Sequence, residues 1–240
     1  MIGIIDIHCH IIYDVDDGPK TLEESKKMLE AAYAGGIRTI IATPHFRRGM
    51  FECAQSKIEE NYEKVKAVGK TIGDGIEILL GCEYYAEFEM VEGLMTKKHL
   101  TMANSCYVLT EFSTMTDFAQ VRAVVYNLIS SGYKPILAHI ERYKCLRNKE
   151  ERIKELINLG AEMQINADSI IGKEGHKNKK CCKKLMKEDL ISFVGTDGHD
   201  SEERAINISQ CVGYVERKMG KEYAEKIFIC NPQKITKTIC

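Results

Sequence analysis

The sequence lacks the features that mark exported, membrane-spanning or nucleic-acid-binding proteins. Its 240 residues contain no segment of signal-peptide type and no apolar run of transmembrane length. The formal net charge is only −1, so the chain as a whole does not attract nucleic acid or an anionic membrane surface. No linker rich in Gly, Pro or Ser divides it, and it has no internal repeat of fixed period. We therefore expect a cytoplasmic protein with one domain over residues 1–240, no nucleic-acid partner and no stable membrane insertion.

The ten cysteines lack the spacing of a disulfide scaffold or of a zinc motif. There is no Cys-x-x-Cys, and Cys181 and Cys182 are adjacent, so we expect reduced cysteines that act as small hydrophobic residues. Cys211 and Arg217 have the Cys-x5-Arg spacing of cysteine-dependent tyrosine phosphatases. Because their segment has the pattern of an amphipathic helix, it lacks the loop of backbone amides that binds phosphate. We interpret this match as accidental.

Short apolar runs rich in β-branched residues alternate with amphipathic helical segments along the chain. The first run, 4–10, is too short for a helix and is predicted to be a buried strand. Thr21 and Glu24 form a capping box that begins the first helix. This alternation implies parallel strands joined by helices, and about seven strands in one domain favour a closed or nearly closed α/β barrel. The predicted strands are 4–10, 38–43, 76–82, 106–110, 135–138, 162–166 and 191–196, and the longer helices are 54–72, 118–130 and 150–159.

Histidines and carboxylates stand where these strands end. His8 and His10 close the first strand, and since side chains alternate, they leave from one face and Cys9 from the other. In a parallel barrel the carboxyl ends of the strands meet at one rim, where such folds place their active sites. So many potential ligands at one rim predict a metal centre. The other residues at strand ends are His45, Glu83, Glu111, His139, Asp197 and His199.

The number and kind of these side chains indicate more than one ion. Five imidazoles and several carboxylates exceed one tetrahedral site, so at least two ions are expected, with a carboxylate such as Glu83 between them. Nitrogen and oxygen ligands suit manganese, iron or zinc. Paired ions can hold a hydroxide and clamp the attacking and leaving oxygens of a phosphoryl transfer. Arg142 and Arg204, each a few residues beyond a strand-end histidine, could bind phosphate oxygens, which points to a phosphoesterase.

Several short motifs together are similar to those of one family. They are Asp6-Ile7-His8-Cys9-His10, Asp16-Asp17-Gly18-Pro19-Lys20, Ala42-Thr43-Pro44-His45, Arg48-Gly49-Met50-Phe51-Glu52, Ala138-His139-Ile140-Glu141-Arg142-Tyr143 and Thr196-Asp197-Gly198-His199. With them the chain resembles, over essentially its whole length, the PHP (polymerase and histidinol phosphatase) superfamily, in particular the bacterial metal-dependent protein-tyrosine phosphatases of capsule and exopolysaccharide operons. The resemblance implies a distorted, TIM-like (β/α)7 barrel with three divalent metal ions, usually discussed as manganese.

The resemblance also implies roles for single residues and a substrate. Arg142 and Arg204 take the phosphate-binding positions. The substrate would be phosphotyrosine on the tail of a tyrosine autokinase that controls capsular polysaccharide export. One ion would be surrounded by His8, His10, Glu83 and Asp197, a second by Glu83, Glu111 and His139, and a third by Asp17, His45 and His199.

The chemistry of tyrosine phosphate agrees with such a site. A phenolate, with a pKa of about 10, is a far better leaving group than an alkoxide, so metals and arginines suffice without a strong general acid. We expect a metal-bound hydroxide to attack phosphorus directly, without a phosphoenzyme. Arg47 and Arg48 either help to hold an acidic, multiply phosphorylated tail or lie in a solvated loop, and the sequence leaves homo-oligomerisation open.

Three other functions are compatible with parts of this pattern. A small-molecule phosphatase of the histidinol-phosphate type is disfavoured only by the family motifs. A nuclease of the same superfamily is disfavoured by the neutral charge and the lack of a basic groove. A regulatory module that binds metal without turnover would have no need of arginines beside the ligands.

Overall fold

The structure, a computed structural model, describes residues 1–87, 90–96 and 99–237. Strands and helices alternate along the chain. The strands are β1 (Ile4–Cys9), β2 (Ile37–Ala42), β3 (His45–Phe46), β4 (Glu77–Leu80), β5 (Glu83–Tyr85), β6 (Tyr107–Glu111), β7 (Lys134–Leu137), β8 (Glu162–Asn166) and β9 (Phe193–Gly195). The α-helices are α1 (Leu22–Ala34), α2 (Gln55–Gly69), α3 (Met90–Met95), α4 (Phe118–Ser130), α5 (Glu150–Leu159), α6 (Ala167–Ile171), α7 (His176–Lys187), α8 (Ile208–Met219), α9 (Lys221–Glu225) and α10 (Pro232–Lys237). Short 3₁₀ turns cover Met102–Asn104 and Ile140–Arg142, and a π-helical turn covers Lys226–Cys230.

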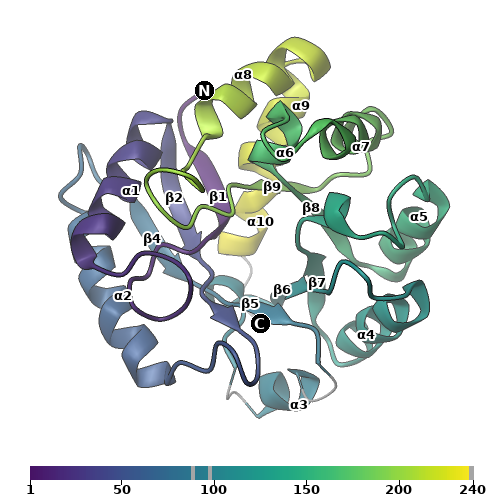
Figure 1. The fold of residues 1–240 in the computed structure, drawn as a ribbon, viewed down its shortest axis with the longest axis horizontal. Helices are drawn as coiled ribbons and strands as arrows, with labels where there is room; N and C mark the ends of the chain where they lie inside the picture. The colour runs from purple at the N-terminus through teal and green to yellow at the C-terminus, as the bar shows by residue number, and fades with distance from the viewer. Residues whose placement is uncertain (88–89, 97–98, 238–240) are drawn as a thin grey trace.

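The named strands pair only in parallel, and the sheet they form is curled (Figure 1). One run has the order β1-β2-β4, and the other has the order β3-β5-β6-β7-β8-β9. Beyond β9, Cys9 pairs with Gly198 in a parallel bridge, and Thr196 donates its backbone amide to the Asp6 carboxylate over 3.0 Å. The first strand therefore lies beside the end of the last. The fold is an α/β fold with a curled parallel sheet, as the sequence predicted in outline.

Several predicted elements have the bounds that the sequence indicated. α4, α5 and β8 match residue for residue, and the capping box is confirmed, with Glu24 donating its amide to Thr21 Oγ1 over 3.2 Å. The sequence did not predict β3 and β5, which resume pairing after breaks of two residues that follow β2 and β4. Pro44, which has no amide proton, lies in the first break, and Gly81 lies in the second. A Cβ on Gly81 would lie 2.9 Å from the Met102 sulfur, so a larger residue there would force the Met102 side chain to shift.

The alternation of side chains along β1 is interrupted just before the two histidines. Ile5 and Ile7 belong to a buried cluster shared with β2, β6, β7 and β9, in the interior of the curled sheet. Cys9 belongs instead to the cluster beneath the helices. The register of β1 against β2 shifts between Asp6 and Cys9, which is typical of a β-bulge. His8 and His10 therefore follow Ile5 and Ile7 into the interior.

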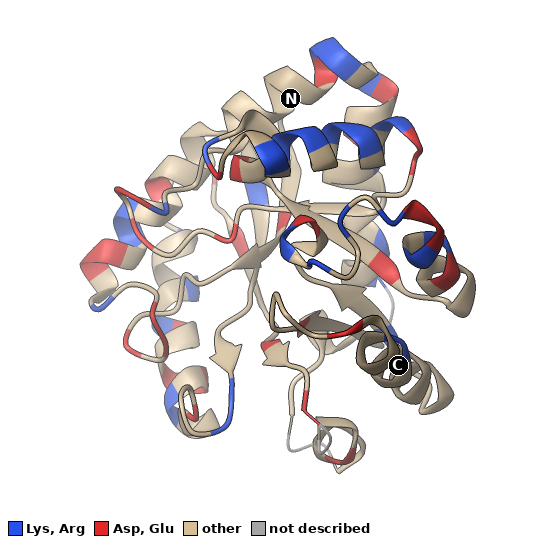
Figure 2. Cartoon of the chain, turned by 45° about the vertical axis from the view of Figure 1, so that its right-hand side comes forward, with Lys and Arg blue, Asp and Glu red and all other residues tan. Residues whose placement is uncertain are grey.

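Helices surround the strands. α1, α2, α4, α5, α7 and α8 lie around the outside of the sheet in Figure 1. Charged residues lie mostly on these helices and on the loops, as Figure 2 shows, while the strands are largely apolar and buried. Within the described residues, no helix combines the length and the apolar character needed to cross a membrane.

Candidate metal centre

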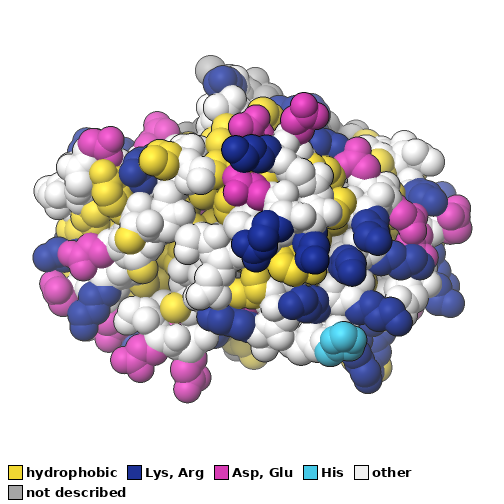
Figure 3. Space-filling view, turned by 90° about the horizontal axis from the view of Figure 1, so that it is seen from above, with side chains coloured by type: hydrophobic (Ala, Val, Ile, Leu, Met, Phe, Trp, Pro, Cys, Tyr) yellow, Lys and Arg dark blue, Asp and Glu magenta, His cyan; other side chains and the backbone are white. Residues whose placement is uncertain are grey.

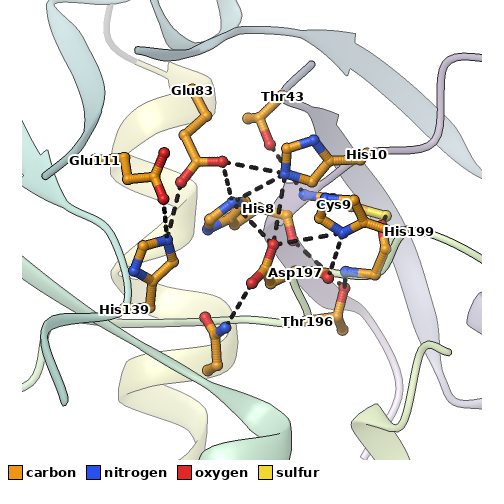
Figure 4. A network of polar contacts seen from close by, with 12 residues as sticks. His8, Cys9, His10, Thr43, Glu83, Glu111, His139, Thr196, Asp197 and His199 are labelled. Carbon is orange, nitrogen blue, oxygen red and sulfur yellow. Dashed lines mark hydrogen bonds and ion pairs between the residues drawn. The ribbon is translucent and has the colours of Figure 1, made fainter. Parts of the chain in front are cut away.

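The carboxyl ends of the strands bring together side chains from distant parts of the chain (Figure 4). Glu83 opens β5, Glu111 ends β6, His139 directly follows Ala138 beyond β7, and the others lie at or after β1, β3 and β9. All nine residues predicted as ligands meet here, namely His8, His10, Asp17, His45, Glu83, Glu111, His139, Asp197 and His199.

Four buried side chains form the middle of the centre. His8 Nε2 lies 3.0 Å from Glu83 Oε2 and 3.5 Å from Asp197 Oδ1. His10 Nε2 lies 3.2 Å and 3.5 Å from the same two oxygens. The two Nε2 atoms are 3.3 Å apart. Two nitrogens and two carboxylate oxygens therefore face one small space, and all four side chains are buried.

The hydrogen bonds at Nδ1 of the two imidazoles determine whether their Nε2 atoms present a lone pair or a proton. His8 Nδ1 lies 3.2 Å from the amide oxygen of Gln164, and His10 Nδ1 lies 2.8 Å from a carboxylate oxygen of Asp16. Both oxygens are hydrogen-bond acceptors, so Nδ1 is the protonated nitrogen of each imidazole in its neutral form, and Nε2 then presents a lone pair. Glu83 Oε2, which faces them, has no hydrogen-bond donor. Lone pairs alone repel one another, so the group fits a divalent cation with nitrogen and oxygen ligands.

The pKa shifts of His10 and Glu83 also indicate that the centre favours positive charge. Burial opposes the imidazolium of His10, but the hydrogen bond to Asp16 and the negative charges of Asp16 and Glu83 raise its pKa well above the usual range. Burial likewise opposes the carboxylate of Glu83, yet His8 and His45 hold the pKa of Glu83 well below its ordinary value. Protons and a metal ion would thus compete for the same nitrogens.

Glu83 connects this group to a second one. Its Oε1 lies 3.1 Å from His139 Nε2, which is 3.7 Å from Glu111 Oε1, and its Oε2 lies 3.2 Å from His45 Nδ1. Burial and the charge of Glu83 raise the pKa of Glu111 to about 7. Two carboxylates therefore crowd one imidazole nitrogen, which is again an arrangement that a cation would relieve.

A third group lies at the more exposed side of the centre. His199 donates its Nδ1 proton to the backbone oxygen of Asp197 over 2.8 Å, so its Nε2 presents a lone pair. That Nε2 lies 3.3 Å from Asp17 Oδ1 and has no hydrogen-bond partner, while His45 Nε2 lies 3.7 Å from the same oxygen. Asp17 is 41% exposed, so this group faces the side from which a substrate can approach.

Two residues of the centre have strained backbones. His139 (φ 33°) and Asp197 (φ 54°) lie in the left-handed region, which costs about 1–3 kcal/mol for a residue other than glycine. Hydrogen bonds hold both in place, because the amide of His139 donates to Gln164 Oε1 over 2.8 Å and that of Asp197 to the His8 oxygen over 2.8 Å. The left-handed backbone conformation directs both side chains toward the centre just after the strands end.

The sequence did not single out the polar residues that support the centre. Gln164 accepts from His8 and from the amide of His139, and its own amide group donates to Asn166 Oδ1 over 2.9 Å. Asn166 in turn donates to Asp197 Oδ2 over 2.8 Å. The polar end of the strand 162–166 was the only signal for them in the sequence. These two buried amides orient three of the predicted ligands at once.

Replacement of Gln164 by leucine tests this support. We expect the affinity for divalent metal to fall about 10–100-fold, because His8 loses its acceptor and the buried amide of His139 is left unpaired. Titration with Mn²⁺ against a competing chelator measures the change. Gln164→Glu, which keeps an acceptor oxygen at the same place, should retain more affinity, and an unchanged dissociation constant in folded Gln164→Leu would contradict the assignment.

The two predicted arginines both reach Asp197. Arg142 donates to Asp197 Oδ2 over 3.0 Å and also pairs with Glu174 at 2.5 Å. Arg204 donates to Asp17 Oδ2 over 3.0 Å and lies 3.6 Å from Asp197 Oδ1. Burial opposes the charge of Arg142, but Asp197 and Glu174 raise its pKa, so it stays cationic. Two guanidinium groups therefore stand beside the centre, where an anionic substrate would need them.

Cys211 is unsuited to nucleophilic catalysis. It is completely buried in α8, and burial raises the pKa of its thiol far above the usual value. The structure therefore agrees with the interpretation that its spacing to Arg217 is accidental.

Comparison with known proteins decides the family. The family model described as capsular polysaccharide synthesis, CpsB/CapC, matches residues 4–237. The chain belongs to the CpsB/CapC family. This confirms the family to which the sequence motifs pointed.

Named relatives of this CpsB/CapC chain match it along nearly its whole length. It is 38% identical to the tyrosine-protein phosphatase CpsB of Streptococcus pneumoniae over 237 residues, which cover 97% of this chain and 98% of that protein. It is 31% identical to the tyrosine-protein phosphatase YwqE of Bacillus subtilis over 221 residues, which cover 91% and 86%. In the solved structures of YwqE and CpsB, described as unique metal-dependent tyrosine phosphatases, a chain matches with a TM-score of 0.90 and 28% identity, covering 99% of this chain and 96% of that one.

A histidinol phosphate phosphatase from Lactococcus lactis shares the fold alone with this CpsB/CapC chain. The match has a TM-score of 0.57 and 14% identity over 92% of this chain and 95% of that one. At that identity the likeness says nothing of the substrate.

Proposed function

We propose that this chain is a metal-dependent tyrosine-protein phosphatase. The observation that carries the proposal is the buried group around Glu83, whose facing lone pairs and carboxylate oxygens call for a cation. The relatives CpsB and YwqE are named tyrosine-protein phosphatases, and the matching solved structures are described as metal-dependent. Membership of a capsular polysaccharide synthesis family is consistent with a role in that process.

We propose further that the centre takes three divalent ions, with manganese the first candidate. When bound, such ions activate water and offset the negative charge of the transferred phosphoryl group. The residues that would hold them are His8, His10, Glu83 and Asp197 for the first, Glu83, Glu111 and His139 for the second, and Asp17, His45 and His199 for the third.

The chain's own cations would bind the phosphate of the substrate. Arg142 and Arg204 approach different oxygens of Asp197, so a phosphate beside that carboxylate can accept from both guanidinium groups. Arg142 is 29% exposed and Arg204 44%, so both can reach a ligand from solvent. The phenolate of tyrosine leaves readily, which removes the need for a strong general acid among the residues nearby.

The finer architecture, partner and location are also part of the proposal. We infer a seven-stranded (β/α) barrel in one domain over residues 1–240, because β2 with β3 and β4 with β5 can each be counted as one kinked strand. The substrate is inferred to be the phosphotyrosine tail of a bacterial tyrosine autokinase in the cytoplasm. Arg47, whose guanidinium carbon lies 4.1 Å from the centre of the Tyr85 ring, would contribute positive charge to the loop beside the centre.

Hydrolysis of a phosphotyrosine peptide by chelated protein, with Mn²⁺ added back, tests the function. We expect turnover only with metal, and an unchanged rate in Cys211→Ser, since that thiol is buried and protonated. Turnover that survives complete metal removal would exclude the proposed chemistry. A clear preference for histidinol phosphate, offered as a competing substrate, would instead assign the chain to a small-molecule phosphatase.

A further inference from the structure

The outer side of α7 carries a dense row of lysines. The helix His176–Lys187 contains six lysines and no acidic residue. Lys177, Lys180, Lys183, Lys184 and Lys187 are exposed, and their spacing of three or four residues places them on one side of the helix. We call these five residues the lysine stripe. Figure 3 views the molecule from above relative to Figure 1. Lysine and arginine side chains gather on the right-hand half of this view, the side on which Figure 1 places α7.

The opposite side of α7 fixes the stripe in place. Cys181, Cys182, Leu185 and Met186 are buried against the body of the protein. The stripe is therefore presented on a packed helix, and its charges keep a defined spacing. Lys177 and Lys187 are about 15 Å apart along the axis at 1.5 Å per residue, a length that about five residues of extended peptide would cover.

Charge balance distinguishes the stripe from other lysine-bearing surfaces. On α2, Lys57, Lys64 and Lys66 each pair with a nearby carboxylate at 2.6–3.2 Å. Within the described residues, the only ion pair of the stripe joins Lys184 to Glu150 at 2.6 Å. The chain as a whole has a net charge of −1, so this positive charge is concentrated locally. The other four lysines of the stripe have no ion pair among the described residues, and positive charge held in this way favours an anionic ligand.

The amino-terminal end of α7 lies close to Arg142 of the metal centre. Glu174, which pairs with Arg142, lies two residues before the start of α7. Asn178, in the first turn of the helix, accepts a hydrogen bond from Arg147 over 3.1 Å. The stripe therefore runs along a helix whose first turn lies near Arg142.

We propose that the lysine stripe is a docking surface for an acidic segment of the phosphorylated substrate protein. This inference rests on the proposed phosphatase function and adds to it a second contact, away from the phosphate. The positive charge of the stripe and the position of the start of α7 near Arg142 favour an acidic segment of the substrate chain. Its contribution is electrostatic, so it raises the association rate and weakens as salt screens the charges.

Charge reversal on the stripe tests the proposal with two peptides. One is a short, neutral phosphotyrosine peptide, and the other carries the same phosphotyrosine followed by a flexible spacer and a run of glutamates. In Lys180→Glu/Lys183→Glu, we expect kcat/KM for the acidic peptide to fall about tenfold at low salt, and to approach the wild-type value at high salt. The value for the short peptide should not change, because neither lysine lies at the centre.

A matched variant controls for net charge. Lys27 in α1 and Lys70 at the end of α2 are exposed, and Figure 1 shows α1 and α2 on the opposite side of the sheet from α7. Lys27→Glu/Lys70→Glu changes the net charge by the same amount. We expect this variant to process both peptides like the wild type. If the stripe and control variants lose activity on the acidic peptide equally, or if neither does, the docking surface is excluded.

Two further outcomes distinguish failure of the docking proposal from failure of the proposed phosphatase function. Absence of turnover on both peptides in the wild type would refute the proposed function itself. Stripe-dependent cosedimentation with phosphatidylglycerol vesicles, together with no preference for the acidic peptide, would overturn the proposal in favour of a membrane surface.

Discussion

Glu83→Gln is expected to lower kcat/KM for a phosphotyrosine peptide about 1,000-fold, or about 4 kcal/mol, and to reduce the metal content of the purified protein. The carboxylate of Glu83 lies 3.0–3.2 Å from nitrogens of His8, His10, His45 and His139. Glutamine keeps the size of the side chain but removes its charge and one acceptor oxygen. Each set of candidate ligands that includes Glu83 would therefore bind metal less tightly. Elemental analysis and steady-state kinetics measure the two effects.

A neighbouring carboxylate provides the control for this variant. Glu77 in β4 is exposed and lies on the same stretch of chain, so Glu77→Gln should leave metal content and turnover unchanged. Glu83→Gln with full metal content and wild-type kinetics would refute the central position assigned to this carboxylate.

Arg142→Ala is expected to lower turnover about 100-fold while the metal content stays the same. Its guanidinium group contacts Asp197 and Glu174 and is the more buried of the two candidates for phosphate binding. Arg142→Lys should recover only part of the activity, because an ammonium group cannot make the paired, planar contacts of a guanidinium group. The kinetics of both variants, with metal analysis in parallel, test the assignment.

The alternatives for Arg142 give different results. Loss of metal in Arg142→Ala would mean that the arginine acts by holding Asp197 in position. Unchanged turnover would remove its proposed role altogether. Glu174→Gln, which breaks the pair from the other side, should not weaken phosphate binding, since it leaves the guanidinium group in place.

The position of the candidate site was predictable because it depends on where strands end. His139 and Asp197 follow short apolar runs in the sequence, and parallel strands place such residues at one rim whatever the details of packing. The bulge in β1 was not predictable, since it depends on the register against β2. Nor were the contacts of Gln164, whose three partners come from β1, the turn after β7 and its own strand. Side-chain networks of this kind depend on tertiary distances that periodicity does not encode.

The interface between β1 and the end of β9 has a consequence for biosynthesis. His8 and His10 are synthesised well before Thr196, whose backbone amide, 190 residues after Asp6, donates to the Asp6 carboxylate. Asp197 and His199 lie in the same segment of the chain as Thr196. A nascent chain can therefore expose His8 and His10 before the residues that complete the site have been synthesised. The ion assigned to His8, His10, Glu83 and Asp197 needs a ligand from that segment, so we expect a product truncated before Asp197 to lack this ion.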